Sequence, residues 1–155
     1  MKVNASTLKW ALRMYPPLFF QRIWVQRFAP DFTSVDVKIN KSVLNKNYNG
    51  TIFGGTIFCG GDPFYAILFD QIFKRKGYNT IAWLKSAHIQ YIKPGTTTLF
   101  FRIQLTDDDI KEAQEQLDTV GKFVKTFPIE IKNKYGEICA VVKNEIYVRN
   151  TDRKN

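Results

Sequence analysis

A long and almost wholly apolar segment in the middle of the chain, residues 56–73, limits the available folds most strongly. It has the length of a helix, and the basic residues and glycine that follow, Lys74 to Gly77, favour a helix C-terminus there. A helix that is apolar on nearly every side must be buried. Pro63 has no N–H to donate, so it either kinks this helix or marks a late start. The chain therefore needs other elements to surround one central helix.

Strand-like segments on both sides of this helix can supply the layer that covers it. Period-two alternation and β-branched or aromatic residues predict six strands, over residues 22–28, 33–40, 80–92, 96–105, 125–132 and 137–148. Lys93-Pro94-Gly95 and residues 133–136 are typical of turns and predict two hairpins between consecutive strands. Strict alternation along residues 80–92 places Trp83 and Ala87 on one face and His88 on the other.

Two further helices complete the predicted order. The first ends at Pro16-Pro17, and the second, over residues 106–119, carries aspartates at its start and an inner apolar stripe. This order predicts an α+β fold in which an antiparallel sheet of about six strands wraps around a long central helix. We expect one domain over residues 1–150 and a polar C-terminal tail over residues 151–155. Pairing with a second copy is one way to cover an exposed sheet edge.

The charge of the chain narrows its partners only in part. Lysine and arginine total 23 against 14 aspartate and glutamate residues, which gives a net charge of +9 at pH 7. Such a charge suits nucleic acid, an anionic membrane surface or a phosphorylated ligand, and it also serves solubility alone. No RNA-binding motif, zinc finger or long run of basic residues accompanies it, so we expect no specific nucleic-acid partner.

Several other classes of protein fit the sequence less well. Uninterrupted apolar runs are only a handful of residues long, such as Tyr65 to Phe69, whereas a membrane-spanning helix needs roughly 20. No export signal is evident, so we expect a cytoplasmic protein. Cys59 and Cys139 form no CxxC pair and His88 is the only histidine, so we expect no metal site. We also expect no cofactor. A Ser-His-Asp triad would have to use His88, and no GxSxG motif accompanies it.

The most specific motif lies between the second predicted strand and the central helix. It reads Asn47-x-x-Gly50-x-x-Phe53-Gly54-Gly55 and is followed by Asp62. Together with the order of elements, this motif resembles the hotdog-fold thioesterases. Among them it is most similar to the phenylacetate-pathway acyl-CoA thioesterase group, within a thioesterase-like branch of that superfamily. The resemblance in element order covers nearly the whole chain, whereas the specific motif covers residues 47–62.

The resemblance implies a role for each residue of the motif. Asp62 falls on the catalytic carboxylate, which activates water or attacks the thioester directly. Gly54 or Gly55 would donate a backbone N–H to the developing oxyanion, and Asn47 would orient the water or the carboxylate. Phe53 stands where these enzymes usually have histidine. In this superfamily the carboxylate and the oxyanion donor come from different protomers, which implies a homodimer or a dimer of dimers.

The substrate-binding part of the site is expected to include Gly50, Phe53 and Lys85. Some members of the group also use a serine or threonine on the strand after the helix. Thr80 and Ser86 are the nearest candidates for that role in this sequence.

Each of these assignments has a structural alternative. Asp62 can cap a helix that starts at Pro63 or pair with Lys85, and the glycines can serve only a tight loop and close helix packing. For the whole protein, hydrolysis of an acyl-CoA or acyl-carrier-protein thioester competes with non-catalytic binding of acyl-CoA or fatty acyl groups, which the missing histidine favours. A dehydratase or hydratase fits least well, because His88 falls on a predicted strand.

Overall fold

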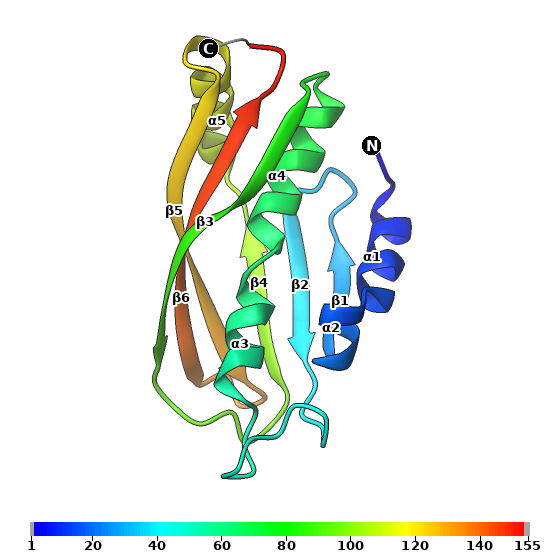
Figure 1. Ribbon diagram of the computed structural model, residues 1–155, viewed down its shortest axis with the longest axis vertical. Coiled ribbons are helices and arrows are strands. Elements are labelled where there is room, and N and C mark those ends of the chain that lie inside the picture. The colour runs from blue at the N-terminus through cyan, green and yellow to red at the C-terminus, as the bar shows by residue number, and fades with distance from the viewer. Residues whose placement is uncertain (1, 154–155) are drawn as a thin grey trace.

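A single antiparallel sheet curls around two consecutive helices in the computed structural model, which describes residues 2–153 (Figure 1). The strand order across the sheet is β1-β2-β4-β5-β6-β3. The strands are β1 (Ile23–Phe28), β2 (Ser34–Ile39), β3 (Thr80–Tyr91), β4 (Leu99–Gln104), β5 (Lys122–Asn133) and β6 (Ile138–Asn150). The helices are α1 (Ala5–Met14), α2 (Pro16–Phe20), α3 (Gly54–Gly61), α4 (Phe64–Arg75) and α5 (Asp107–Thr119). The prediction of a six-stranded antiparallel sheet around a central helix is confirmed.

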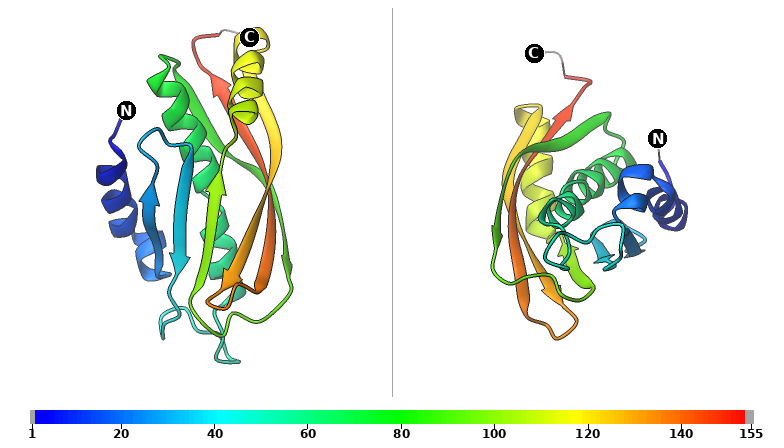
Figure 2. Two further views of the ribbon diagram at one scale, coloured as in Figure 1. Left: turned by 180° about the vertical axis from the view of Figure 1, so that it is seen from behind. Right: turned by 60° about the horizontal axis from the view of Figure 1, so that its bottom comes forward.

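The core lies between the concave face of the sheet and the pair α3 and α4, which the sheet wraps as seen from the end of the molecule (Figure 2). Alternate strand residues point inward and are almost fully buried, as Val35 and Val37 of β2 show. Phe64, Phe69 and Phe73 of α4 are inaccessible to solvent and fill the space beneath the sheet. The apolar character of the central segment is therefore explained by burial against the sheet.

The central helix is broken at Asp62-Pro63 rather than continuous through residues 56–73. The chain forms α3 and then α4, and α4 starts directly after Pro63, whose ring cannot donate the next helical hydrogen bond. Gly60 permits α3 to approach β2 closely, because a Cβ there would lie 2.7 Å from Cδ1 of Ile39. Asn144 of β6 donates its side-chain N–H to the Gly61 carbonyl at 2.7 Å, which satisfies an acceptor freed by the break.

The predicted hairpin at Lys93-Pro94-Gly95 is wrong. β3 pairs with β6, and β4 pairs with β2 and β5, so the two strands lie far apart in the sheet. The connection crosses the end of the molecule and is fixed there because Ile52 donates its N–H to the Gly95 carbonyl at 2.9 Å. The second predicted hairpin, through residues 133–136, is confirmed between β5 and β6. Gly136 provides the positive φ, 83°, that this turn requires.

A β-bulge in β3 reverses part of the predicted face pattern. The pairing register with β6 shifts between Leu84 and Ser86. One extra residue in the strand exchanges inward and outward positions, so Trp83 and Ala87 do not share a face as predicted. Trp83 is 45% exposed and stacks on Tyr147 of β6, with ring centroids 4.8 Å apart.

The sheet splits between β4 and β5. These strands pair at only two positions, Leu99 with Asn133 and Phe100 with Lys132, and then diverge toward α5. Tyr65 of α4 reaches into the split and donates its hydroxyl hydrogen to the Pro128 carbonyl at 2.8 Å. Burial is the main cause that raises the pKa of the Tyr65 phenol, and the nearby Asp109 carboxylate raises it further. The hydroxyl therefore stays protonated and can donate this hydrogen bond. Pro128 is tolerated inside a long strand because no partner strand faces its missing N–H across the split.

Tyr65→Phe is expected to lower the free energy of unfolding by about 1–3 kcal/mol, because it removes this bond and leaves the Pro128 carbonyl with no partner. Chemical denaturation followed by circular dichroism measures the change. Tyr135→Phe is the matched control, because Tyr135 is 71% exposed on the β5–β6 turn and should change stability by no more than about 0.5 kcal/mol. Equal stability of Y65F and the wild type would contradict this account of the split.

The two edges of the sheet differ in how they are protected. α1 packs along β1, and Arg13 of α1 donates its Nε–H to the Val25 carbonyl at 2.8 Å. The opposite edge is β3, a 12-residue strand that pairs only with β6 among the described residues. Ile81 and Tyr91, near the two ends of β3, are 42% and 52% exposed. A long uncovered edge with exposed apolar side chains is a template for pairing with another chain.

Candidate functional site

Asp62 lies at the break between α3 and α4, where it lines a hollow between α4 and β3. The hollow has a volume of about 580 Å³. Residues of α4 and β3 form the apolar walls of this hollow. Besides Asp62, its polar groups are the ion pair of Lys74 with Asp70 and the hydroxyl of Thr80. The apolar residues are Pro63, Ala66, Ile67, Ile81, Ala82, Trp83 and Leu84, and the other polar residues are Asp70, Lys74 and Thr80.

The carboxylate of Asp62 differs from that of Asp70 in the same hollow. Asp70 accepts bonds from Lys74 at 2.7 Å and from the Thr80 hydroxyl at 3.0 Å. Asp62 has no hydrogen-bond or ion-pair partner for its carboxylate within residues 2–153. Although the residue is accessible to solvent, desolvation in the hollow raises the pKa of the Asp62 carboxyl. An unpaired carboxylate with a raised pKa beside an apolar hollow is suited to accept a proton or to act as a nucleophile.

The structural alternatives for Asp62 are not formed. Lys85 pairs instead with Glu145 of β6, with an Nζ–Oε1 distance of 2.8 Å. Pro63 occupies the N-cap position of α4, and no side chain caps that helix. Cys59, one turn before Asp62, has its thiol pKa raised by burial and by the Asp62 charge, so it remains protonated.

The two predicted oxyanion donors form the first turn of α3. Phe53 is the N-cap residue and makes no side-chain cap, while its carbonyl accepts from the N–H of both Thr56 and Ile57. The N–H groups of Gly54 and Gly55 have no acceptor in the part of the chain that the structure describes. They are therefore available donors at a helix N-terminus, where the dipole favours negative charge.

Aromatic rings crowd both glycines. A Cβ on Gly54 would lie 3.1 Å from ring atoms of Tyr91, whose hydroxyl donates to the Gly54 carbonyl at 2.8 Å. A Cβ on Gly55 would clash with the ring of Phe53, which is 57% exposed. The absence of side chains here is required by close packing as well as by access to the N–H groups.

Asn47 and Gly50 shape the loop before α3. The Asn47 side chain accepts from the Thr51 N–H at 3.0 Å and donates to the Thr51 hydroxyl at 2.9 Å. Gly50 has φ +75° at the tip of this loop. Asn47 and Gly54 line a second hollow, of about 320 Å³, together with Tyr91. Within one chain Asn47 therefore stabilises the loop that precedes the glycines, and both of its side-chain hydrogen bonds are made to Thr51.

Asp62 and the glycines do not meet within one chain. They stand at opposite ends of α3, and eight residues of helix separate Gly54 from Asp62 by about 12 Å. Thr80, one of the two assisting candidates, lines the Asp62 hollow, whereas Ser86 lies beyond the bulge on an exposed position. A site that combines the carboxylate with the open N–H groups therefore requires a second copy of the chain.

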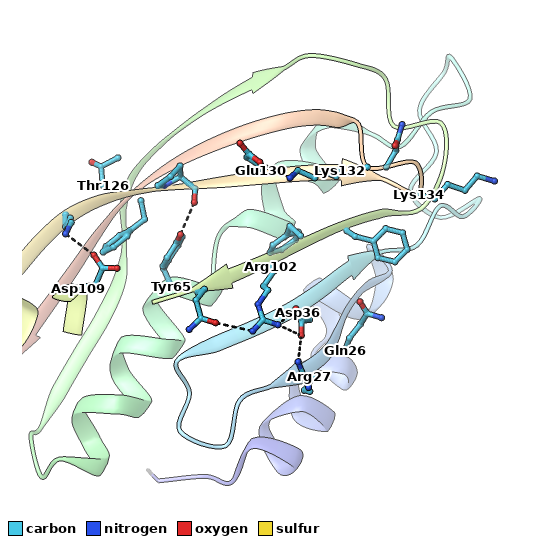
Figure 3. Close-up of a pocket in the computed structure, with 18 residues that line it drawn as sticks. Gln26, Arg27, Asp36, Tyr65, Arg102, Asp109, Thr126, Glu130, Lys132 and Lys134 are labelled. Atoms are coloured by element: carbon cyan, nitrogen blue, oxygen red, sulfur yellow. Dashed lines mark hydrogen bonds and ion pairs between the residues drawn. The ribbon is translucent and has the colours of Figure 1, made fainter. Parts of the chain in front are cut away.

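A larger hollow lies elsewhere, at the split between β4 and β5, and has a volume of about 1220 Å³. Figure 3 shows Tyr65 pointing into it beside Asp109, with Arg102 and Asp36 at its rim. Its charged groups are mostly paired, since Asp36 contacts Arg102 at 3.0 Å and Lys125 contacts Asp109 at 2.9 Å. No predicted site residue lines this hollow. It arises from the divergence of two strands, which no local sequence pattern indicates.

No group of three or more histidine, cysteine, aspartate or glutamate side chains is placed to hold a metal ion within residues 2–153. No helix in the described part of the chain is long and apolar enough to cross a membrane.

The fold is shared with proteins of known structure. PA5026 from Pseudomonas aeruginosa, a protein of unknown function and probable thioesterase, superimposes with a TM-score of 0.79 at 12% identity over 96% of this chain and 97% of that chain. The PaaI protein of the E. coli phenylacetic acid degradation operon gives 0.60 at 14% identity over 93% and 95%. The smu.793 protein of Streptococcus mutans, solved with bound acetyl CoA, gives 0.56 at 19% identity over 76% and 82%. No curated protein matches the sequence.

The sheet around a central helix and these likenesses define a hotdog-fold protein. Within that class, the chain belongs to the family described as a domain of unknown function, DUF4442, which it matches over residues 4–148. The resemblance to hotdog-fold thioesterases is confirmed at the level of the fold. The comparisons do not favour the phenylacetate-pathway group over other proteins of this fold, because PA5026 superimposes more closely than PaaI does.

Proposed function

We propose that this protein is a thioesterase that hydrolyses an acyl-CoA or acyl-carrier-protein thioester, with a site shared between two protomers. The observation that carries the proposal is Asp62: an unpaired carboxylate, with its pKa raised by desolvation, beside an apolar hollow. The similar fold of smu.793, solved with acetyl CoA, supports a coenzyme A thioester as the substrate class. The net charge of +9 suits the phosphates of either carrier.

In the proposed reaction the thioester carbonyl carbon lies near Asp62 of one protomer. Its oxygen accepts a hydrogen bond from the Gly54 or Gly55 N–H of the partner subunit. Asp62 takes a proton from water as the water oxygen attacks the carbonyl carbon, and the N–H donor stabilises the resulting oxyanion. Collapse of the tetrahedral intermediate breaks the C–S bond, and the thiolate takes the proton from Asp62. The products are a carboxylic acid and a free thiol, and the carboxylate is regenerated.

Direct attack by Asp62 is the second route that the same geometry supports. The carboxylate would displace the thiolate and form an anhydride, which water then hydrolyses. In either route the apolar wall of the hollow, which includes Ile67 and Trp83, would hold the acyl group. The ion pair of Lys74 with Asp70 leaves Asp62 as the only uncompensated charge among the hollow's described lining residues.

A second copy is proposed to pair through β3. This edge is long and uncovered, and the Asp62 hollow opens beside it, since five consecutive β3 residues, 80–84, line that hollow. Pairing of two β3 edges would continue the sheet from one protomer into the next and bring the partner's α3 toward the hollow. Asp62 and the glycine N–H groups, which lie about 12 Å apart within one chain, would then be brought together from two chains.

A non-catalytic acyl-binding module is the second candidate, and Phe53 favours it. This residue stands where the resembled enzymes have histidine, and its ring lies over Gly55. A ring at that position can restrict the approach of a substrate oxygen to the N–H groups. Binding of acyl-CoA or a fatty acyl group would remain possible in the hollow.

Release of thiol from short, long and aromatic acyl-CoA thioesters distinguishes the two candidates. The thioesterase proposal expects turnover of at least one thioester by the wild type. Saturable stabilisation by the same ligands in a thermal-shift assay, with no thiol release from any of them, would favour the binding module.

A further inference from the structure

Large apolar side chains are exposed along α1, α2 and the loop over residues 41–46. Their exposed fractions are 55% for Trp10, 67% for Met14, 53% for Tyr15, 62% for Phe20 and 60% for Leu44. Trp10 and Met14 are four residues apart and share one face of α1. The loop is joined to the end of α2 because Asn45 donates its side-chain N–H to the Gln21 carbonyl at 2.8 Å. Figures 1 and 2 show α1 followed by α2 at the β1 edge of the molecule.

Basic side chains gather around two tryptophans of this surface. Lys9 Nζ and Arg13 Cζ lie 5.6 and 4.8 Å from the ring centroid of Trp10. The ring of Trp24 has three cations around it, at 5.4 Å for Arg13, 5.5 Å for Arg22 and 5.7 Å for Lys38. Arg13 lies over both rings and therefore connects the helix to the outer face of β1. We call these residues, with the exposed apolar side chains above, the α1–α2 surface.

The chain segments that form this surface contain no carboxylate. Residues 1–30 contain five basic residues and residues 37–61 contain three, and neither segment contains an aspartate or glutamate. None of Lys9, Arg13, Arg22 and Lys38 forms an ion pair within residues 2–153. By contrast, Arg27 and Arg102 share Asp36 on the neighbouring part of the sheet. The positive potential of the α1–α2 surface is left for a partner to neutralise.

The cluster also contains donors that lack acceptors. Arg22 Nε and Trp24 Nε1 are buried and have no hydrogen-bond partner among the described residues. Arg22 further adopts a left-handed backbone conformation, with φ 61°, which is costly for a residue other than glycine. These two buried atoms are themselves out of reach of a docked ligand. Phosphate oxygens are strong acceptors for arginine, and Arg13 and Arg22 have no ion-pair partner among the described residues.

We propose that the α1–α2 surface docks on the headgroup layer of an anionic lipid bilayer. Exposed tryptophan, tyrosine and phenylalanine side chains beside lysine and arginine are what an interfacial surface requires, because the rings enter the headgroup region and the cations meet phosphates. A nucleic acid would match the charge but offers no comparable layer for Met14, Phe20 and Leu44. β1 and β3 are opposite edges of the sheet, so docking here is compatible with pairing at β3. The inference does not depend on thioesterase activity.

Sedimentation of the full chain with vesicles tests this proposal. One set is phosphatidylcholine alone, and the other contains about one third phosphatidylglycerol. The wild type should sediment with the anionic vesicles and be released by salt. The double variant Lys9→Gln/Trp10→Ser should lower the partition coefficient by about tenfold or more. Phe20→Ser tests the apolar contribution alone and should lower binding without a change in charge.

Lys134→Gln/Tyr135→Ser is the matched control. It also removes one lysine and one exposed aromatic ring in mutual contact, with Nζ 5.0 Å from the ring centroid, but on the β5–β6 turn. It should bind within about twofold of the wild type. Circular dichroism checks that every variant is folded. Equal binding of the two double variants, equal binding to both vesicle types, or no wild-type binding would overturn the proposal. Salt-sensitive retention on duplex DNA with no vesicle binding would assign the surface to nucleic acid instead.

Discussion

Asp62→Asn is expected to reduce thioester hydrolysis by at least about a hundredfold while the protein stays folded, because the amide can neither accept the proton from water nor act as a nucleophile. Thiol release on the best substrate of the wild type measures the effect. Asp70→Asn is the matched control in the same hollow. It breaks the pair with Lys74 and should lower stability by about 1 kcal/mol. It changes the charge of the hollow but keeps the Asp62 carboxylate, so turnover should remain measurable.

The stability of Asp62→Asn carries information that activity alone does not. Desolvation raises the pKa of Asp62 in the folded protein, so the folded state binds its proton more tightly than the unfolded state does. The charged carboxylate therefore costs stability above the folded pKa, and the cost is relieved as the pH falls through that value. We expect Asp62→Asn to melt at the same temperature as the wild type or higher at pH 7, with no difference in acid.

The same pKa direction sets the pH dependence of the reaction. The base acts only when ionised, so kcat/KM should fall on the acid side at a pH above the ordinary range for aspartate.

A less stable Asp62→Asn protein at pH 7 would indicate a structural role for the carboxylate. Full turnover by a folded Asp62→Asn protein would remove Asp62 from the chemistry.

Ala87→Pro is expected to give a folded monomer that has lost turnover. The N–H of Ile92 donates to the Cys139 carbonyl of β6. Backbone N–H groups along a strand point alternately to its two sides, so the N–H of Ala87, five residues earlier, points away from β6 and toward the free edge. Proline at this position removes an edge donor and keeps the β3–β6 ladder, as edge strands permit. Because the proposed site needs groups from two protomers, loss of the dimer should remove activity.

Light scattering after gel filtration measures the mass, and thiol release is assayed on the same fractions. Ala87→Ser retains the N–H and should behave as the wild type in both. A monomeric Ala87→Pro protein with undiminished turnover would show that one chain holds a complete site. A dimer that persists in Ala87→Pro would move the interface away from this edge.

Much of the fold can be predicted from the sequence because local patterns carry it. A segment that is apolar on nearly every side, residues 56–73, has to be largely buried, and alternating strands supply the layer that buries it. The strand order could not be predicted in the same way. Lys93-Pro94-Gly95 has the composition of a hairpin turn, yet the seven-residue connection over 92–98 carries the chain to another part of the sheet. Pairing is decided by long-range packing.

The candidate site shows a similar division. Residues 47–62 form a motif that the sequence alone shows, and the structure gives Asp62 an environment suited to a reactive carboxylate. The motif does not indicate that Asn47 is engaged with Thr51 or that Tyr91 packs on Gly54, because these contacts depend on the loop and on a strand distant in sequence. It also does not place the carboxylate near the glycines. Their separation depends on residues 54–61 being helical, which places the glycines and Asp62 at opposite ends of α3.

The most direct test of the shared site is complementation between two inactive variants. One is Asp62→Asn. The other is whichever of Gly54→Pro and Gly55→Pro abolishes turnover by removing the N–H donor. The backbone at residue 54 accepts proline, because Phe53, with φ −58° and ψ 132°, has the conformation that residues before proline prefer. The new ring must displace an exposed aromatic side chain, Tyr91 at residue 54 or Phe53 at residue 55, so circular dichroism has to show that the chosen variant is folded.

The two variants are unfolded together, mixed in equal amounts and refolded. In a mixed dimer, one shared site has both defects and the other has neither. Half of the dimers should be mixed, so we predict recovery of about a quarter of wild-type turnover, because one in four sites is intact. Turnover that stays at the level of the separate variants, in a mixture shown to contain mixed dimers, would contradict a site built from two chains.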